Sequence, residues 1–322
     1  MTTPVTVDDI TAAHNARLGR IDPLIAPATA LDPADPGYLR AEAAGGAVEA
    51  MARFEQTDAA SPFAVWGALR RHELDVRIGG DEPDIALGSV LDQWLDRIAR
   101  TERPGDVDSW ARVSVASRDI DIVNALLQRG FSANGVSAVR LRPRGLGKVV
   151  APAPPAVAGA VIRRARVDDA PELGRLDEHL LALDAHFGGV TMRDGAAGMF
   201  TAAYLERLAA APETTWVLER DGRITGFLHA VPHAVAAEPG APSLALSGGQ
   251  YLFVMYLDKA ERGNGTGAVL ARFAHEALDA TGSPYTLLSY AAANPRSGPF
   301  WARMGYRPLV TDWQRRPAVL AR

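Results

Sequence analysis

The sequence predicts an α/β protein made of two tandem domains, and three observations support this. The chain has 322 residues, about twice the length of a typical domain. In the second half, short apolar or alternating runs that are typical of strands alternate with segments whose apolar residues recur at helical spacing. A Pro/Ala-rich stretch, VVAPAPPAVAGAV, separates this half from a first half that repeats parts of its pattern.

The composition limits the class of protein. Hydrophobic residues make up 48% of the chain, charged residues make up 22%, and the formal net charge is -4. This mild acidity argues against nucleic-acid binding, because nucleic-acid-binding proteins carry a basic excess. The chain has no cysteine, which excludes disulfides, thiolate metal sites and a cysteine nucleophile. Neither a signal peptide nor a membrane-spanning run is found, so we expect a cytoplasmic protein with no membrane partner.

The Pro/Ala-rich stretch marks the predicted domain boundary. Pro152, Pro154 and Pro155 prevent a regular helix and favour an extended connector. The prediction is therefore a first domain at residues 1–148, a linker at 149–160 and a second domain at 161–322. Prolines at positions 23, 27, 33 and 36 further predict that residues 1–40 form an irregular arm.

The second half reads as a regular order of elements. AVIRRARVDD predicts a strand, with Asp168 or Asp169 capping the next helix. Asp221 and Gly222 separate two apolar runs and predict a β-hairpin. Helices are expected over residues 170–187, 197–211, 267–278 and 294–304, and further strands over 251–257, 284–292 and 305–316.

The first half contains two segments similar to parts of the second, in the same order. GSVLDQWLDRIA at 88–99 resembles GAVLARFAHEAL at 267–278. LLQRGFSANGVSAVRLRP at 126–143 resembles WARMGYRPLVTDWQRRP at 301–317. Amphipathic helices look alike by chance, but two matches in one order predict a duplicated unit.

The sequence RGNGTG, at residues 262–267, lies between an apolar run and a helix. A dinucleotide site needs an acidic residue at the end of the next strand, and a P-loop needs a lysine. Both are missing here, which argues against an NAD-linked oxidoreductase. The first amides of a helix have no intrahelical partner and attract anions. Arg262 adds a charged, planar donor, so the loop predicts a site for a diphosphate such as that of coenzyme A.

RGNGTG resembles the Arg/Gln-x-x-Gly-x-Gly/Ala signature of the GNAT superfamily of N-acyltransferases, and the order of elements from residue 161 to about 315 is similar to that of the family. The resemblance implies two tandem GNAT-like domains, each a mixed, mostly antiparallel sheet flanked by helices, with the first domain degenerate. It implies an enzyme without a metal that transfers an acetyl group from acetyl-CoA to a primary amine of a small molecule or peptide. The alternative is a non-catalytic acyl-CoA sensor or scaffold.

The resemblance also assigns cofactor contacts. Main-chain groups of Met255 and Leu257 would bind the pantetheine arm, and Asn294 would hold its far side. Trp301, also expected at the cofactor, stands where the family commonly has the tyrosine that protonates the leaving thiolate. The pyrophosphate would lie on Arg262, Gly263, Asn264, Gly265, Thr266 and Gly267.

Four residues are candidates for proton transfer. Tyr251 and Tyr256 lie on the strand before the glycine loop, where packing in the core is the alternative role. Asp184 and His186 follow the first helix, where the family usually builds its acceptor site. A carboxylate there would attract a cationic amine, and a histidine would act as a base near neutral pH; a surface position is the alternative for both.

The first half is expected to bind no acyl-CoA. Aligning Gly88 with Gly267 puts Pro83 at the position of Arg262, which removes an amide and a guanidinium. The neighbouring acids Asp81, Glu82 and Asp84 would repel a pyrophosphate.

No metal site is predicted. His229 and His233 are close in sequence, but a third ligand is not evident. The sequence leaves the acceptor, the acyl-chain length and the oligomeric state open.

Overall fold

The computed structural model describes residues 6–43, 45–61, 64–143, 157, 159–234 and 243–321. The chain divides into two compact units that interleave along the sequence. The first unit contains the chain up to Val136, a short loop at 242–245, and the chain from Pro308 onward; the second contains the rest. The sequence predicts two consecutive domains instead, and the predicted linker at 149–160 lies largely outside the described residues.

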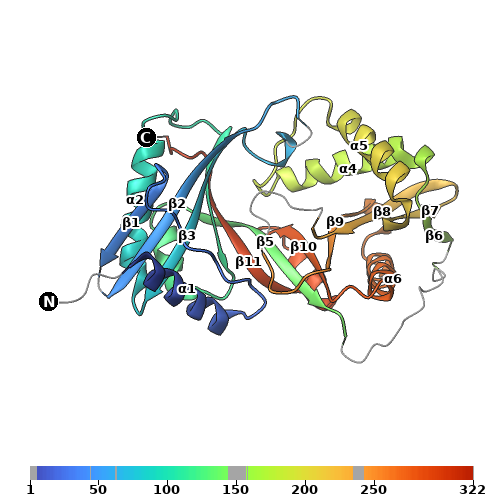
Figure 1. Cartoon of the computed structure of the whole chain (residues 1–322). Helices are drawn as coiled ribbons and strands as arrows, with labels where there is room; N and C mark the ends of the chain where they lie inside the picture. Colours follow the sequence, from blue (N-terminus) through green and yellow to red (C-terminus); the bar gives the residue numbers. More distant parts are fainter. Residues whose placement is uncertain are drawn as a thin grey trace. The chain divides into compact units, whose positions relative to one another are not determined.

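The sheet of the first unit has the strand order β1-β2-β3-β4-β11. Strands β1, β2 and β3 are antiparallel, β3 and β4 are parallel, and β4 and β11 are antiparallel. Helix α2 packs on one face against Val48, Val76 and Ile78, and α1 lies on the other face (Figure 1). The elements are α1 (Val7–Ile21), β1 (Tyr38–Ala43), β2 (Gly46–Gln56), β3 (Arg70–Gly80), α2 (Pro83–Ile98), β4 (Ser109–Ala116), α3 (Val123–Leu127) and β11 (Arg307–Arg315).

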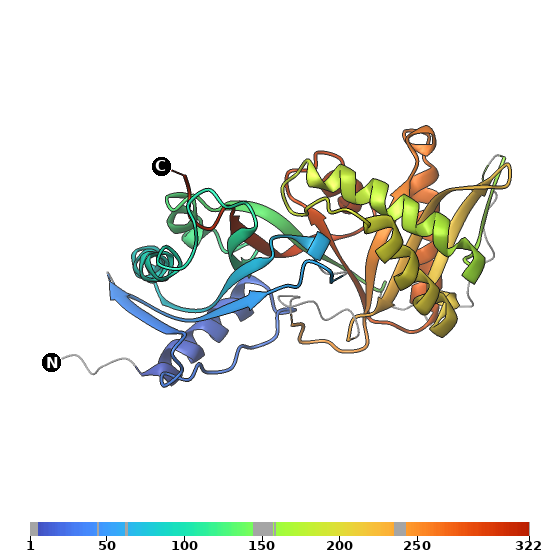
Figure 2. The ribbon, with the colours of Figure 1, turned by 90° about the horizontal axis from the view of Figure 1, so that it is seen from above.

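The sheet of the second unit has the order β5-β10-β9-β8-β7-β6. Helices α4 and α5 cover one face of this sheet, and α6 covers the other (Figures 1 and 2). The hairpin turn is as predicted, with positive φ at Asp221 and Gly222. The elements are β5 (Ser132–Leu141), β6 (Ala160–Arg164), α4 (Ala170–Ala185), α5 (Ala196–Ala210), β7 (Thr215–Arg220), β8 (Arg223–Pro232), β9 (Gln250–Leu257), α6 (Thr266–Ala280), β10 (Tyr285–Ala291) and α7 (Ser297–Arg303).

The last strand of each predicted copy lies at least partly in the other copy's unit. Strand β11 follows α7 in sequence but pairs with β4, with Val310 opposite Ala116. Strand β5 follows α3 but lies beside β10, where Ser137 and Ser289 share a hydroxyl hydrogen bond of 3.1 Å. This exchange explains why the compact units do not follow the linear boundaries.

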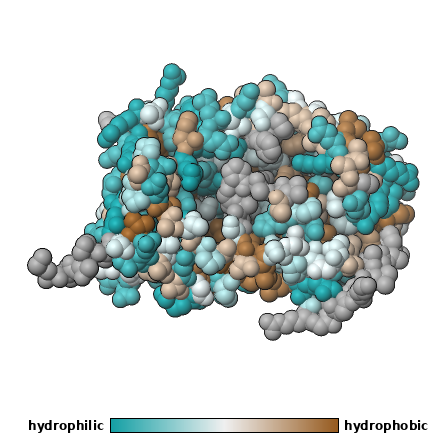
Figure 3. All heavy atoms as spheres, in the orientation of Figure 1, coloured by the Kyte–Doolittle hydropathy of each residue, from teal (hydrophilic) through white to brown (hydrophobic). Residues whose placement is uncertain are grey.

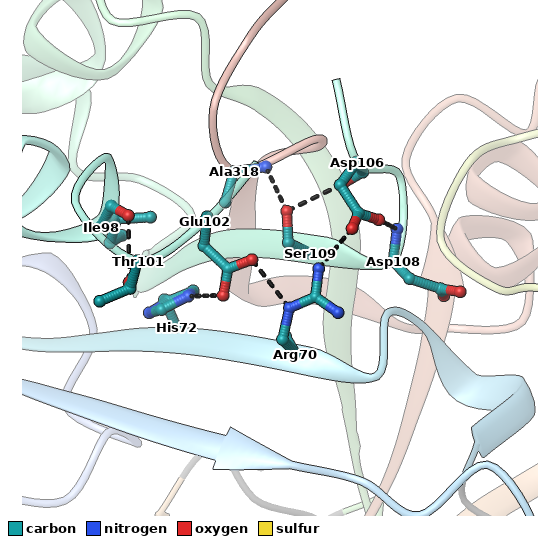
Figure 4. Close-up of polar contacts among 9 residues, drawn as sticks. All are labelled: Arg70, His72, Ile98, Thr101, Glu102, Asp106, Asp108, Ser109 and Ala318. Atoms are coloured by element: carbon teal, nitrogen blue, oxygen red, sulfur yellow. Dashed lines mark hydrogen bonds and ion pairs between the residues drawn. The ribbon is translucent and has the colours of Figure 1, made fainter. Parts of the chain in front are cut away.

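The end of the chain is fixed in the first unit. The Ala318 amide donates to the Ser109 carbonyl at 3.1 Å and lies 3.2 Å from its hydroxyl oxygen (Figure 4). The Ser109 hydroxyl donates to the Asp106 carbonyl at 2.8 Å. Glu102, in the same connection between α2 and β4, contacts Arg70 and His72 of β3 at 2.8 and 2.9 Å. These contacts hold β3, β4 and the segment after β11 together.

The prediction of an irregular arm is wrong for α1. The Thr6 side chain accepts from the Asp9 amide, and the Asp9 carboxylate accepts from the Thr6 amide, which forms a capping box. Ile10, His14 and Leu18 follow at helical spacing and are buried. The prolines of the arm begin only at position 23, so they end this helix without interrupting it.

The surface is mixed in character. The face drawn in Figure 3 is largely hydrophilic, with hydrophobic residues in small separate areas. Among the described residues, none of the helices combines the length and the apolar character needed to cross a bilayer.

Candidate acyl-carrier site

Strands β9 and β10 of the second unit pair over a very short length. Their partners are Gln250 with Thr286 and Tyr251 with Leu287. Beyond these residues β9 stays with β8, and the register of that pair shifts at Phe253, between His229 and Ala230. Such a bulge bends a strand and increases its twist. The rest of β9 therefore diverges from β10 and leaves one side of its backbone without a strand partner.

The two faces of β9 have different surroundings. Leu252, Met255 and Leu257 point toward α6 and belong to, or pack against, the hydrophobic core there. On the other face the Tyr256 ring lies 6.3 Å from the His179 ring of α4. The sheet thus separates a side formed by α6 and α7 from a side formed by α4 and α5.

Helix α6 begins at a glycine turn whose backbone requires glycine. Gly263 and Gly265 have φ of 87° and 88°, a region that side chains other than glycine rarely occupy. No described atom lies within 4 Å of where a Cβ would project at either position. The turn is therefore open in front of the first turn of α6.

Several amides at this turn are free to bind a ligand. Within the described part of the chain, the N–H groups of Gly263, Asn264, Gly265 and Gly267 have no hydrogen-bond partner. The Thr266 amide and hydroxyl both donate to Asn264 Oδ1, at 3.1 and 2.7 Å. Unpaired amides at the positive end of a helix dipole suit an anion, so this turn is a candidate anion site.

Arg262 is held at the edge of the turn. Its Nε donates to the Leu257 carbonyl at 2.8 Å, and its guanidinium lies 5.3 Å from the Tyr256 ring centre. These contacts fix the side chain and occupy one of its donors. The Leu257 carbonyl, expected to bind pantetheine, is therefore already bonded within the chain.

The other predicted cofactor residues lie around α7. Asn294 Oδ1 accepts from the amides of Arg296 and Ser297 at 3.1 and 3.4 Å, which fixes the start of α7. The Trp301 indole is buried in the core and lies 5.4 Å from the Tyr306 ring. Trp301 therefore has a packing role in addition to any contact with a cofactor.

The sequence analysis missed Tyr290. This residue is on β10 beyond the last pair with β9, and it packs against the same core as Met255. Its hydroxyl lies close to α7, 3.7 Å from where a Cβ of Gly298 would be. Burial raises the pKa of Tyr290, so the phenol stays protonated at neutral pH. The signal that could have indicated Tyr290 is a tyrosine on the strand that follows the glycine turn and α6.

The candidate proton-transfer residues lie on the face covered by α4 and α5. Burial raises the pKa of Asp184, at the end of α4, to about 6. His186 is exposed, and its Nδ1 donates to the Ala182 carbonyl at 2.8 Å. Tyr251 and Tyr256 are both buried. The structure gives no contact among these four described residues.

A buried polar cluster lies beneath this face. The Tyr204 hydroxyl donates to Asp177 Oδ2 at 2.9 Å, and His229 Nδ1 lies 2.7 Å from Thr215 Oγ1. Burial raises the pKa of Asp177 to about 7 and lowers the pKa of His229 to about 3. At pH 7 the His229 imidazole is therefore neutral, and the Asp177 carboxyl group is about half protonated.

The two histidines considered for a metal do not share partners. His229 contacts Thr215, whereas His233 Nδ1 lies 2.8 Å from the Tyr285 hydroxyl. No group of three or more potential ligands for a metal occurs among the described residues.

The corresponding turn in the first unit differs. Helix α2 begins at Pro83 and α6 begins at Thr266. When the helix starts are matched, Pro83 corresponds to Thr266, whereas the sequence alignment matched it with Arg262. Gly80, with φ of 89°, then corresponds to Gly263.

The start of α2 is also covered. A Cβ on Gly46 would lie 2.6 Å from the Glu82 carbonyl oxygen, because the start of β2 packs directly on this backbone. The Asp84 carboxylate accepts from the Ala125 amide at 2.8 Å. Backbone and an acidic side chain thus occupy the space in front of α2, where α6 has an open turn.

Comparison with known proteins identifies the second unit. Residues 211–308 match the family described as "Acetyltransferase (GNAT) domain". The chain contains a GNAT domain. The predicted α/β class is confirmed, and the GNAT match includes β9, the glycine turn, α6 and β10.

The solved structures to which the chain is similar are distant from it in sequence. The chain is similar to a GCN5-related N-acetyltransferase from Sphaerobacter thermophilus, with 13% identity, a TM-score of 0.52, and coverage of 86% of this chain and 82% of that chain. A tandem GNAT protein from the clavulanic acid biosynthesis pathway matches at 12% identity, with a TM-score of 0.45 and coverage of 90% and 86%. PaiA N-acetyltransferase from Thermoplasma acidophilum, solved with coenzyme A, matches at 12% identity, with a TM-score of 0.36 and coverage of 48% and 97%. A comparison with curated protein sequences finds no match.

Proposed function

We propose that the GNAT domain transfers an acetyl group from acetyl-CoA to a primary amine of a small molecule or peptide. One observation carries the proposal: a run of unpaired amides before α6, at the end of a strand that has separated from its neighbour. The amides suit a diphosphate. The unpaired side of β9, around Met255, suits the amides of a pantetheine arm, which would add to the sheet as a further strand.

The reaction is a direct transfer between two bound substrates. The amine nitrogen attacks the thioester carbonyl, a main-chain N–H near the bulge at Phe253 stabilises the developing oxyanion, and the carbon–sulfur bond breaks. A cationic amine loses two protons, one before the attack and one after it, and the thiolate gains one, so the reaction needs a base and an acid and releases one proton. No metal is required for this chemistry.

Asp184 is the candidate base, because its buried surroundings raise the pKa of its carboxyl group. Its carboxyl group, with a pKa of about 6, is ionised at pH 7 and is basic enough to take a proton from an ammonium ion through water. Its negative charge would also attract a cationic acceptor. Tyr290 is the candidate acid, because it lies on the side of α7 and keeps its proton at neutral pH.

The alternative function is a sensor or scaffold that binds acyl-CoA without turnover. The buried Trp301 favours it, since this residue stands in place of a tyrosine and cannot donate a proton usefully. Binding would then depend on the glycine turn alone.

The test combines calorimetry with a thiol-release assay over a panel of amines. We expect one CoA per chain and thiol release with at least one amine. The Tyr290→Phe variant should bind CoA normally and lose turnover. Binding without release across a wide panel would support the sensor, and no CoA binding would refute both functions.

A further inference from the structure

The first unit contains the same divergence of two parallel strands as the GNAT domain. Strands β3 and β4 pair up to Leu74 and Val113, after which β3 continues beside β2 and β4 beside β11. Ile78 lies on the stretch of β3 beyond the last pair with β4, as Met255 lies on the stretch of β9 beyond the last pair with β10. Ile78 therefore belongs to the part of β3 that corresponds to the part of β9 proposed to face a pantetheine arm.

In the first unit this backbone donor is already bonded. The Ile78 amide donates to Nδ1 of His14, in the middle of α1, at 3.1 Å. Burial and the nearby Arg77 lower the pKa of His14 to about 4. The imidazole is therefore neutral at pH 7, with its proton on Nε2, and the lone pair on Nδ1 accepts the Ile78 amide.

The same helix is also bonded to the segment that follows β4. Arg17 Nε donates to Asp119 Oδ2 at 2.9 Å, and its Nη2 contacts Asp119 Oδ1 and Asp121. Arg17 and Asp119 are both buried. Asp22, directly after α1, pairs with Arg118 at 3.0 Å. Helix α1 thus connects β3 with the segment that follows β4.

Packing leaves little space between α1 and β3. A Cβ on Gly79 would lie 3.1 Å from Cβ of Ala13 and 3.7 Å from the Ile10 carbonyl oxygen. Ile10 itself is 1% exposed. The glycine allows the helix to approach the strand at the level of Ile78.

We propose that α1 permanently occupies the place where β3 and β4 of the first unit separate. There it binds the Ile78 amide and the segment after β4, which an acyl carrier would need. This rests on the proposed function, in which the carrier lies along β9. The first unit then fails to bind an acyl carrier for two reasons. The start of α2 is covered, and α1 lies where the ligand would lie. The chain binds one acyl-CoA, through the second unit.

Amide hydrogen exchange tests the helix contact without any ligand. In His14→Leu the Ile78 amide loses its acceptor, so we expect its exchange to be about 10-fold faster or more. In His14→Asn the side-chain oxygen stands near the position of Nδ1, and exchange should stay close to the wild-type rate. Equal protection in the Leu variant and the wild type would overturn the proposal.

Two measurements on the unaltered protein complete the test. Imidazole nitrogen chemical shifts should show His14 as the neutral tautomer protonated on Nε2 at pH 7, even if the Leu variant fails to fold; a charged ring or the other tautomer would refute the contact. Calorimetry should give one CoA per chain, and a value of two would refute occupation by α1. Complete absence of CoA binding would instead refute the proposed function and leave the exchange result standing.

Discussion

Asp177 shows at the level of a single residue how burial changes a proton equilibrium. Its carboxyl group is 1% exposed and accepts one hydrogen bond, from Tyr204. The other oxygen, Oδ1, has no partner among the described residues. Desolvation of the carboxylate therefore raises the pKa to about 7, although the hydrogen bond from Tyr204 and the charge of Arg207 partly offset it.

The first prediction concerns the pH dependence of stability. Because the folded-state pKa of Asp177 lies above its value in the unfolded chain, its contribution to the unfolding free energy falls as the pH rises from about 4 to about 7. Asp177→Asn keeps an acceptor for Tyr204 and does not titrate. The variant should be more stable than the wild type at pH 8, by about 4 kcal/mol at most, and the two should converge near pH 4. Urea unfolding across this range measures the difference; identical pH profiles would contradict the shifted pKa.

The second prediction concerns Arg262, whose guanidinium lies beside the glycine turn and next to Tyr256. Arg262→Glu removes a charged donor and adds a repulsive charge, so CoA affinity should fall by about 100-fold in calorimetry. Arg53→Glu, an exposed position in the first unit, makes the same change in net charge and should leave affinity unchanged. Equal CoA affinities of the two variants would show that Arg262 does not contact the cofactor.

At the scale of elements, the start of α6 depends on backbone conformation more than on side chains. Gly265 is the N-cap residue in the left-handed region, and the adjoining amides are free because the turn does not fold back on itself. Helix α2 has neither feature, because its N-cap is Glu82 with negative φ and the start of β2 packs against it. Two helices with similar apolar patterns therefore differ in the capacity to bind an anion.

The third prediction uses two glycines in matched positions. Gly195 is the N-cap of α5, also left-handed, and a Cβ there would meet no described atom within 4 Å. Gly265→Ala and Gly195→Ala should therefore lose similar stability, about 1 kcal/mol each. Only Gly265→Ala should weaken CoA binding, by about 10-fold or more, since its Cβ projects where the diphosphate would lie. Calorimetry together with thermal unfolding separates the two effects, and equal loss of binding in both variants would contradict the assignment.

At the scale of the whole molecule, each unit needs a strand from the other half of the sequence. β11 completes the sheet beside β4, and β5 completes the sheet beside β10. A half-chain cut near residue 150 would therefore leave one sheet short and one strand without its native partner. Unpaired strand edges promote association.

The fourth prediction follows from this exchange. Residues 1–148 and 159–322, expressed separately, should each be aggregated or poorly folded, whereas co-expressed they should purify as a stable pair. Circular dichroism and size-exclusion chromatography of the three samples measure this. Two stable monomeric halves would show that the exchanged strands are dispensable.

The sequence alone determined the features that depend on local backbone chemistry. The glycine turn, the hairpin at Asp221 and Gly222, and the helices with leucine at helical spacing are confirmed because short-range sterics and periodicity specify them. The capping box at Thr6 and Asp9 is equally local and indicates α1; the prolines of the following segment obscured it.

Only the tertiary structure decided which strands share a sheet, and which side chains lose their water. Nothing in β5 or β11 specifies its partner, because an alternating strand pairs equally well with any complementary edge. The raised pKa of Asp177, the role of His14 as acceptor for Ile78, and the position of Tyr290 beside α7 all depend on groups distant in sequence. Burial and long-range hydrogen bonding arise from the packing of the complete chain, so a linear pattern cannot supply them.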